Sequence, residues 1–189
     1  MIVVFVESWN NQFKKVSFEA VSYAHSWANT AGCGVRAITS ASAENANQLA
    51  QYGADEIATL ELAKTGAGIG AQLAGLVGDA QGVVVAGTAM GKIIAPTLAA
   101  LSNGALSTNT TNTPTSTNPV IVERGAFSSK GIETISLNNG LPIISFVPNA
   151  IGIKEEVGAG AMSTAESAHS DMLNVDEVSV ASGLSLIHI

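Results

Sequence analysis

Two glycine-containing segments hold the residues of this sequence that could bind a phosphate. Residues 66–71 read GAGIGA and formally satisfy the GxGxxA pattern, in which glycines let a pyrophosphate approach the start of a helix. The next apolar run, residues 83–87, ends without an acidic residue to bind a ribose hydroxyl. We therefore interpret residues 66–71 as a loop and a helix of small residues that packs closely, with dinucleotide binding as the alternative.

Residues 87–92 (GTAMGK) directly follow an apolar run, where amides of a following helix could face an anion. The segment lacks the GxxxxGK[ST] spacing of a phosphate-binding P-loop. We interpret Lys92 as a first-turn helix residue that faces solvent or a partner, with an anion-binding role as the alternative. Thr88 is expected to cap the turn.

Residues typical of hydrolytic catalysis occur without the partners that they need. His25 falls in an expected helix, His169 in a polar stretch and His188 near the end of the chain, and none has a visible nucleophile partner. No GxSxG elbow is present, and Cys33 between two glycines is interpreted as a turn residue rather than a nucleophile. The sequence therefore predicts no catalytic residues.

Isolated charged residues are expected to have structural or solvent-facing roles. We expect Glu7 and the pair Glu155-Glu156 to be solvated surface charges. Arg124 lies in an otherwise apolar segment and is expected to form an ion pair or a subunit contact. A single cysteine, with no CxxC or Cys/His cluster, allows neither an internal disulfide nor a zinc site and favours a reducing cytosol.

Composition narrows the possible partners. The 189 residues carry 15 acids and 8 strong bases, a net charge of −7, which argues against a nucleic-acid partner because phosphate binding needs a clustered basic face. The longest apolar runs are far shorter than the roughly 20 residues that span a bilayer. We expect neither membrane insertion nor a targeting segment at the N-terminus.

Alternating apolar runs and helix-like segments position these residues. Strands are expected at residues 2–6, 35–39, 56–60 and 83–86, and helices at 16–28, 44–52, 69–77 and 92–101. The first helix is expected to end near Gly32, and Gly53 is expected to be a left-handed stop after the second. This order predicts an α/β fold: a three-layer α/β/α, Rossmann-like, mostly parallel sheet.

The second half predicts an antiparallel addition to that sheet. Residues 107–118, rich in Thr, Ser and Asn, are expected to form a surface loop. Strands follow at 120–124, 132–137 and 141–147, and Asn139-Gly140 predicts a hairpin between the last two. Residues 148–168 are expected to be an extended segment or linker.

The order of several short motifs resembles the N-terminal domain of the electron transfer flavoprotein alpha subunit over residues 1–180. The resemblance is carried by IVVFVE (2–7), FKK (13–15) before FEAVSYA (18–24), YGADEI (52–57), GKIIAPTLAA (91–100), and VER (122–124) with Phe127 and Lys130. It implies an adenine nucleotide alpha hydrolase-like fold and a role as scaffold and beta-subunit interface.

What the resemblance implies is an electron carrier rather than an enzyme. In that family FAD lies in a separate C-terminal domain, which opens with a VSGGRG-like strand and turn, and the beta subunit holds AMP. Electrons come from acyl-CoA dehydrogenases, as in fatty acid beta-oxidation, and pass to a quinone oxidoreductase. The FAD-domain signature is absent here, so no catalytic, cofactor-binding or metal residue is carried over.

The resemblance also divides the chain. We expect the domain at residues 1–160, a polar linker at 161–183 toward a missing FAD domain, and a non-native, adapter-derived tail at 184–189 (LSLIHI). The expected location is the bacterial cytoplasm.

Two other readings stay open. One is a free-standing adenine-nucleotide-binding module resembling a universal stress protein, for which Gly75 and Gly78 fit the first half of the motif and Thr88 falls out of register. The other is a short Rossmann enzyme that uses residues 66–71 and lacks the ribose carboxylate.

Overall fold

A mixed sheet with helices on both faces forms the molecule, which the computed structural model describes at residues 1–128 and 130–167. The strands are β1 (Ile2–Val6), β2 (Val35–Ser40), β3 (Glu56–Leu60), β4 (Gly82–Ala86), β5 (Ala105–Thr110), β6 (Ser116–Thr117), β7 (Val120–Ala126), β8 (Gly131–Leu137), β9 (Pro142–Phe146) and β10 (Ala161–Thr164). The helices are α1 (Lys15–Ala31), the 3-10 helix η1 (Ala46–Gln51), α2 (Gly66–Ala74) and α3 (Gly91–Leu101). His169, His188, the later part of the expected linker and the expected tail at 184–189 lie outside the described residues.

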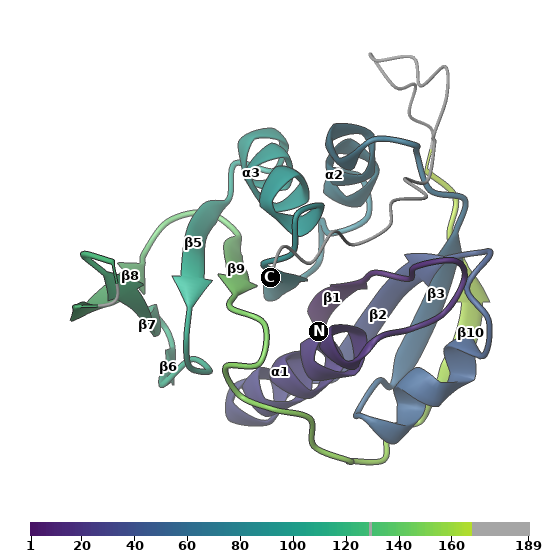
Figure 1. The fold of residues 1–189 in the computed structure, drawn as a ribbon, viewed down its shortest axis with the longest axis horizontal. Coiled ribbons are helices and arrows are strands. Elements are labelled where there is room, and N and C mark those ends of the chain that lie inside the picture. Colours follow the sequence, from purple (N-terminus) through teal and green to yellow (C-terminus); the bar gives the residue numbers. More distant parts are fainter. Residues whose placement is uncertain (129, 168–189) are drawn as a thin grey trace, which may run out of the picture.

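The strand order confirms the Rossmann-like, three-layer prediction. The sheet runs β10-β3-β2-β1-β4-β9-β5-β7-β6, with β8 paired to β7, and every pair from β10 to β5 is parallel. The pairs that involve β6, β7 and β8 are antiparallel and form the predicted addition. Figure 1 shows this addition at one end of the molecule, opposite β10.

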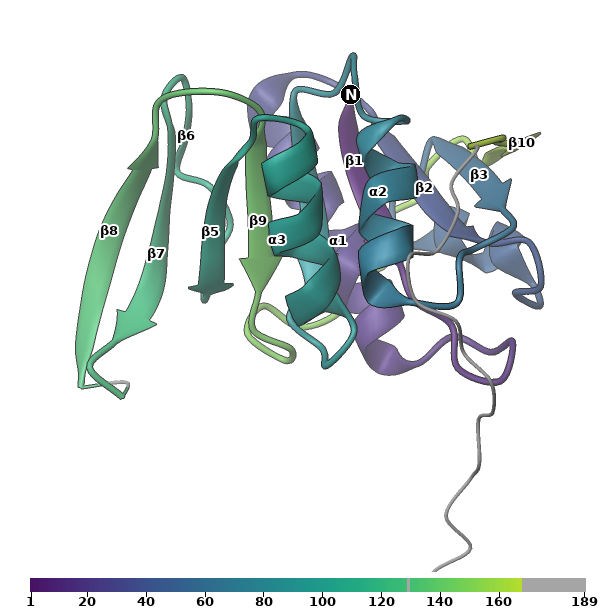
Figure 2. The same cartoon turned by 90° about the horizontal axis from the view of Figure 1, so that it is seen from above.

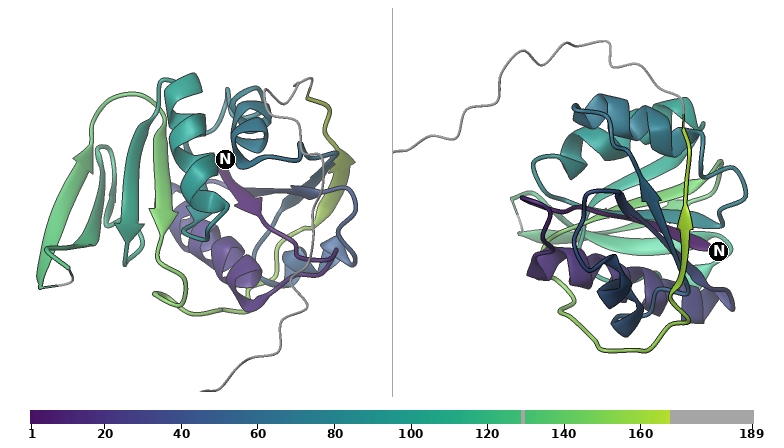
Figure 3. Two further views of the ribbon diagram at one scale, coloured as in Figure 1. Left: turned by 45° about the horizontal axis from the view of Figure 1, so that its top comes forward. Right: turned by 90° about the vertical axis from the view of Figure 1, so that its right-hand side faces the viewer.

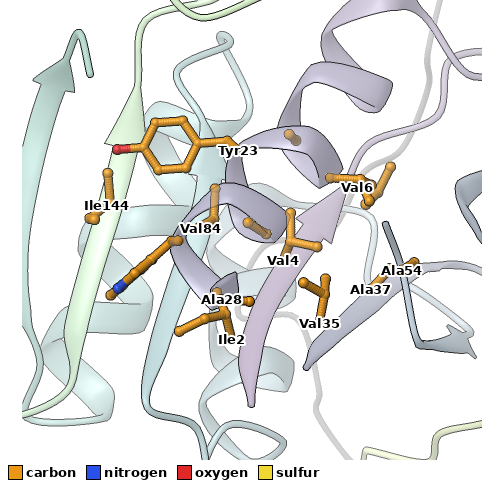
Figure 4. Packing of buried hydrophobic residues seen from close by; sticks show 14 of the residues in the cluster. Ile2, Val4, Val6, Tyr23, Ala28, Val35, Ala37, Ala54, Val84 and Ile144 are labelled. Atoms are coloured by element: carbon orange, nitrogen blue, oxygen red, sulfur yellow. The ribbon is translucent and has the colours of Figure 1, made fainter. Parts of the chain in front are cut away.

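Helices cover the two faces of the parallel strands because those strands are apolar on both sides. All residues of β1 and β4 are buried, so neither face can be left to water. Ile2, Val4 and Val6 belong to the cluster with α1, whereas Val3 and Phe5 belong to the cluster with α2 and α3. Figure 4 shows the first of these clusters, and Figure 3 shows the layers from the edge of the sheet.

The first half follows the sequence prediction closely. α1 ends next to Gly32, as expected, and Gly32 caps it with a left-handed φ of 66°. Gly53, the expected left-handed stop, has a φ of 104°. The helix expected at 44–52 is a shorter 3-10 helix, η1. α2 begins three residues earlier than expected, since the Thr65 hydroxyl accepts a hydrogen bond from the Gly68 amide (3.0 Å) and caps it.

Two expectations for the second half are wrong. Part of the expected surface loop at 107–118 is β5, in which the buried side chains of Ser107 and Thr110 hydrogen-bond each other (3.1 Å) and so tolerate burial. Asn139-Gly140 does not join a hairpin: β8 pairs with β7, and β9 lies parallel between β4 and β5. Because β9 is almost wholly buried and β8 mostly exposed, burial of an apolar strand outweighs the local turn signal.

A buried carboxylate fixes the segment after β9, which is extended as expected. Glu19 of α1 is 2% exposed and accepts hydrogen bonds from the amides of Asn149 (2.7 Å), Ile151 (3.1 Å) and Gly152 (3.1 Å). The segment then reaches the far edge of the sheet, where β10 pairs with β3. Glu19 thus anchors the segment that connects β9 to β10, for which the sequence predicted only an extended segment or linker.

The α2 and α3 helices pack closely because Gly66 and Gly70 lie between them. A Cβ on Gly70 would stand 2.8 Å from the Thr97 Cβ and 2.9 Å from the Ile94 carbonyl oxygen. A backbone carbonyl cannot move away without shifting the helix. This confirms the interpretation of residues 66–71 as small-residue helix packing.

We expect Gly70→Ala to lower the free energy of unfolding by about 1 to 2 kcal/mol, because overpacking costs more than the gain in helix propensity returns. Urea denaturation measures the change. Gly78→Ala is the control, since a Cβ at Gly78 would meet nothing within 4 Å. Equal stability of Gly70→Ala and the native chain would contradict the close packing.

Candidate functional site

The candidate site lies at the carboxyl ends of β1 and β4, where the strand order reverses. Chain order runs outward from β1 through β2 to β3 on one side and from β4 onward on the other. Ligands of open α/β sheets bind at such a switch point, with phosphates at the N-terminus of the following helix. Here that helix is α3, and the residues at the edge are Glu7 after β1 and residues 87–92 after β4.

The Glu7 carboxylate lies against the start of α3. Its Oε1 accepts a hydrogen bond from the Thr88 hydroxyl, whose oxygen accepts one from the Gly91 amide (2.9 Å). Burial raises the pKa of the Glu7 carboxyl, while the hydrogen bonds from Thr88 and from the Gly91 backbone oppose this rise. The expectation that Glu7 is a solvated surface charge is therefore wrong, because its neighbours exclude much of the water.

Four of the six backbone amides of residues 87–92 are already bonded within the chain, the Gly91 amide to the Thr88 hydroxyl among them. The Gly87 amide donates to the Phe146 carbonyl (2.8 Å), the Thr88 amide to the Ala86 carbonyl (2.8 Å) and the Lys92 amide to the Thr88 carbonyl (3.0 Å). A Cβ on Gly91 would stand 1.9 Å from the Ala86 carbonyl oxygen, so α3 begins directly against the end of β4. The turn is tight, and its amides at residues 87, 88, 91 and 92 are engaged, so they cannot cradle a phosphate as the turn stands.

Other residues of this edge confirm the sequence predictions. Thr88 caps the turn before α3, as expected. Lys92 lies in the first turn of α3 and is exposed, which agrees with its interpretation as a solvent- or partner-facing residue.

The remaining candidate residues are dispersed over the molecule. Arg124 forms the expected ion pair, with its Nε 2.9 Å from a Glu133 carboxylate oxygen. His25 lies in α1, where its Nδ1 is 3.3 Å from the Gly53 carbonyl oxygen, and Cys33 is half-buried after that helix. Glu155 and Glu156 are exposed, as expected.

Two acids with structural roles were missed. Glu19 lies three residues after Val16 and four before Tyr23, a spacing that places it on the buried face of α1 and could have revealed it. Asp55 joins β2 to β3, since its Oδ2 accepts a hydrogen bond from the Val35 amide (2.9 Å). Neither lies at the switch point.

In the described part of the chain, no three His, Cys, Asp or Glu side chains group together as a metal site. None of the helices there is both long and apolar enough to cross a membrane.

The fold, together with the position of the candidate site, defines the class of protein. A mostly parallel sheet with helices on both faces and a strand-order reversal at β1 and β4 is a Rossmann-like α/β domain of the nucleotide-binding type. A family model described as the electron transfer flavoprotein domain matches residues 2–172, and the chain belongs to this family. A search of curated proteins finds no match to the chain.

The raised pKa of Glu7 predicts a pH-dependent stability. A carboxyl whose pKa is higher in the folded state than in the unfolded state favours folding below its ordinary pKa and loses that contribution as pH rises through the folded value. Glu7→Gln cannot lose this proton, so we expect its stability relative to the native chain to increase from about pH 4 to about pH 8. Urea denaturation across this range measures the difference.

Glu61→Gln is the control, because Glu61 follows β3 as Glu7 follows β1 but is exposed. A pH-independent difference between Glu7→Gln and the native chain, once the Glu61→Gln profile is subtracted, would contradict the role of burial.

Proposed function

We propose that this chain is the N-terminal domain of the alpha subunit of an electron transfer flavoprotein, and that it serves as scaffold and beta-subunit interface. The match of the electron transfer flavoprotein domain over residues 2–172 carries the proposal. The motifs of β1, α1 and α3, which resemble the alpha subunit, support the choice of subunit. Because β10 (Ala161–Thr164) pairs with β3, the domain extends past the expected boundary at residue 160, and the residues after β10 lead toward a further domain that holds FAD.

Neither FAD nor AMP fits the switch point as the chain folds. The position at the start of α3 where a phosphate would lie is taken by the Glu7 carboxylate, and the amides of residues 87, 88, 91 and 92 have acceptors within the chain. This supports the alpha rather than the beta subunit, because in this family the beta subunit holds AMP. Bound FAD would supply the one-electron chemistry, and the residues of this domain would hold the subunits together.

Exposed apolar side chains on the β7–β8 hairpin support a role for this hairpin as the beta-subunit interface. Phe127 is 86% and Ile132 75% exposed at its tip, beside an open groove of about 510 Å³. Figure 2 shows the hairpin extending beyond the helical layers, so the fold itself does not cover these side chains. Large apolar side chains at such a position favour a protein partner.

In the complete protein, the heterodimer would take electrons from acyl-CoA dehydrogenases and pass them to a quinone oxidoreductase in the bacterial cytoplasm. On this proposal no residue of the chain breaks a substrate bond, so it is a carrier subunit and not an enzyme.

Substitution at the hairpin tests the interface. We expect Phe127→Ser with Ile132→Thr to weaken binding of an electron transfer flavoprotein beta subunit by about tenfold or more, since exposed aromatic anchors dominate interfaces. Titration calorimetry measures the affinity. Val157→Ser is the matched control, because Val157 is 91% exposed in the segment that leads to β10, remote from the hairpin. Equal affinities for the two variants would contradict the hairpin as interface.

Flavin retention tests the function itself. A longer gene product that contains this domain, coexpressed with the beta subunit, is expected to purify with a flavin absorbance spectrum, while the 189-residue chain is expected to be colourless. Retention of ATP or NAD by the 189-residue chain would contradict the proposal and favour a free-standing nucleotide-binding module.

A further inference from the structure

An acid from a different strand occupies the start of α3. The N-terminus of an 11-residue helix carries partial positive charge and attracts anions. The first turn of α3 contains no acidic residue of its own. The carboxylate that reaches this position is Glu7, more than 80 residues earlier in the chain, through Thr88 and Gly91.

Glu7 also fixes the start of α1, on the other side of the switch point. Its backbone carbonyl accepts a hydrogen bond from the Ser17 hydroxyl (2.7 Å), and the Ser17 oxygen accepts one from the Lys14 amide (3.2 Å). One residue at the end of β1 therefore holds the first turns of both helices that flank the candidate site.

The ion pairs of the described residues do not include Glu7, so the start of α3 is the main group that stabilises its carboxylate. Lys14, the lysine nearest to Glu7 along the chain and the N-cap of α1, lies over the Trp9 ring, 4.4 Å from its centroid. Lys92 of α3 is exposed, and the ion pairs Arg36–Glu56 and Arg124–Glu133 do not involve Glu7.

We propose that the Glu7 carboxylate takes the place of a ligand phosphate at the start of α3 and so closes the nucleotide position of this fold from within. Other folds of this type bind nucleotides at this switch point. Here the anion is a side chain of the protein itself, and the turn at residues 87–92 packs against it. The proposal rests on the geometry of this edge and not on the identity of the subunit, so it stands or falls separately from the proposed function.

Removal of the carboxylate tests this proposal in the 189-residue chain. Inorganic phosphate and AMP are titrated into the native chain, Glu7→Ala, Glu7→Gln and the control Glu61→Ala, with circular dichroism as the check of folding. We expect Glu7→Ala to bind phosphate roughly tenfold more tightly than the native chain, because an anion is then free to replace the lost charge at the helix terminus. The amide resonances of Gly91 and Lys92 should shift on titration.

Glu7→Gln keeps the shape and a hydrogen-bond acceptor without the charge, so it carries the test if Glu7→Ala fails to fold, and a smaller gain in phosphate affinity is expected. Binding of phosphate would support the proposal, because it shows that an anion can replace the Glu7 carboxylate. Binding of AMP that shifts the same amide resonances would show in addition that the rest of a nucleotide is accommodated. The proposal is overturned if the folded Glu7 variants bind phosphate no more tightly than the native chain, or if Glu61→Ala gains as much affinity.

Discussion

The burial of β1 and β4 on both faces is the constraint on which the rest of the structure depends. Every residue of these two strands is buried, so the sheet needs a helical layer on each side before it can exclude water. The chain supplies α1 on one face and α2 with α3 on the other. Polar side chains are thereby confined to the ends of the strands, which is why the candidate site can lie only at an edge of the sheet.

Close helix packing determines what that edge can do. α3 must lie against β4 and α2, and the approach of Gly91 to the Ala86 carbonyl leaves no space between strand end and helix start. The amides of residues 87, 88, 91 and 92 have acceptors within the chain, and the Glu7 carboxylate lies against the positive end of α3. The same packing that stabilises the core thus removes the cavity that a nucleotide-binding relative of this fold would need.

Sequence periodicity predicted the first half of the fold well because its strands and helices follow one another locally. β1, β3 and α3 lie where the apolar spacing places them, and Thr88 caps the turn as its type suggests. The second half depends on pairing between distant segments. β9 enters between β4 and β5, and no local pattern at Asn139-Gly140 could reveal a partner that lies far away in the chain.

Side-chain burial was the other quantity that local reasoning missed, and the two acids concerned show why it matters here. Glu7 precedes α1 and Glu19 lies within it, and both direct their carboxylates toward backbone amides, at the start of α3 and at residues 149–152. With 15 acids and only 8 strong bases, the chain has few cations to pair with a buried carboxylate. Backbone amides stabilise such a charge without a second side chain, and an amide engaged in this way is no longer free for a ligand. The amides bonded to Glu19 only anchor the segment after β9, whereas at the switch point the Glu7 carboxylate lies against the donors at the start of α3 that a nucleotide-binding domain keeps for phosphate.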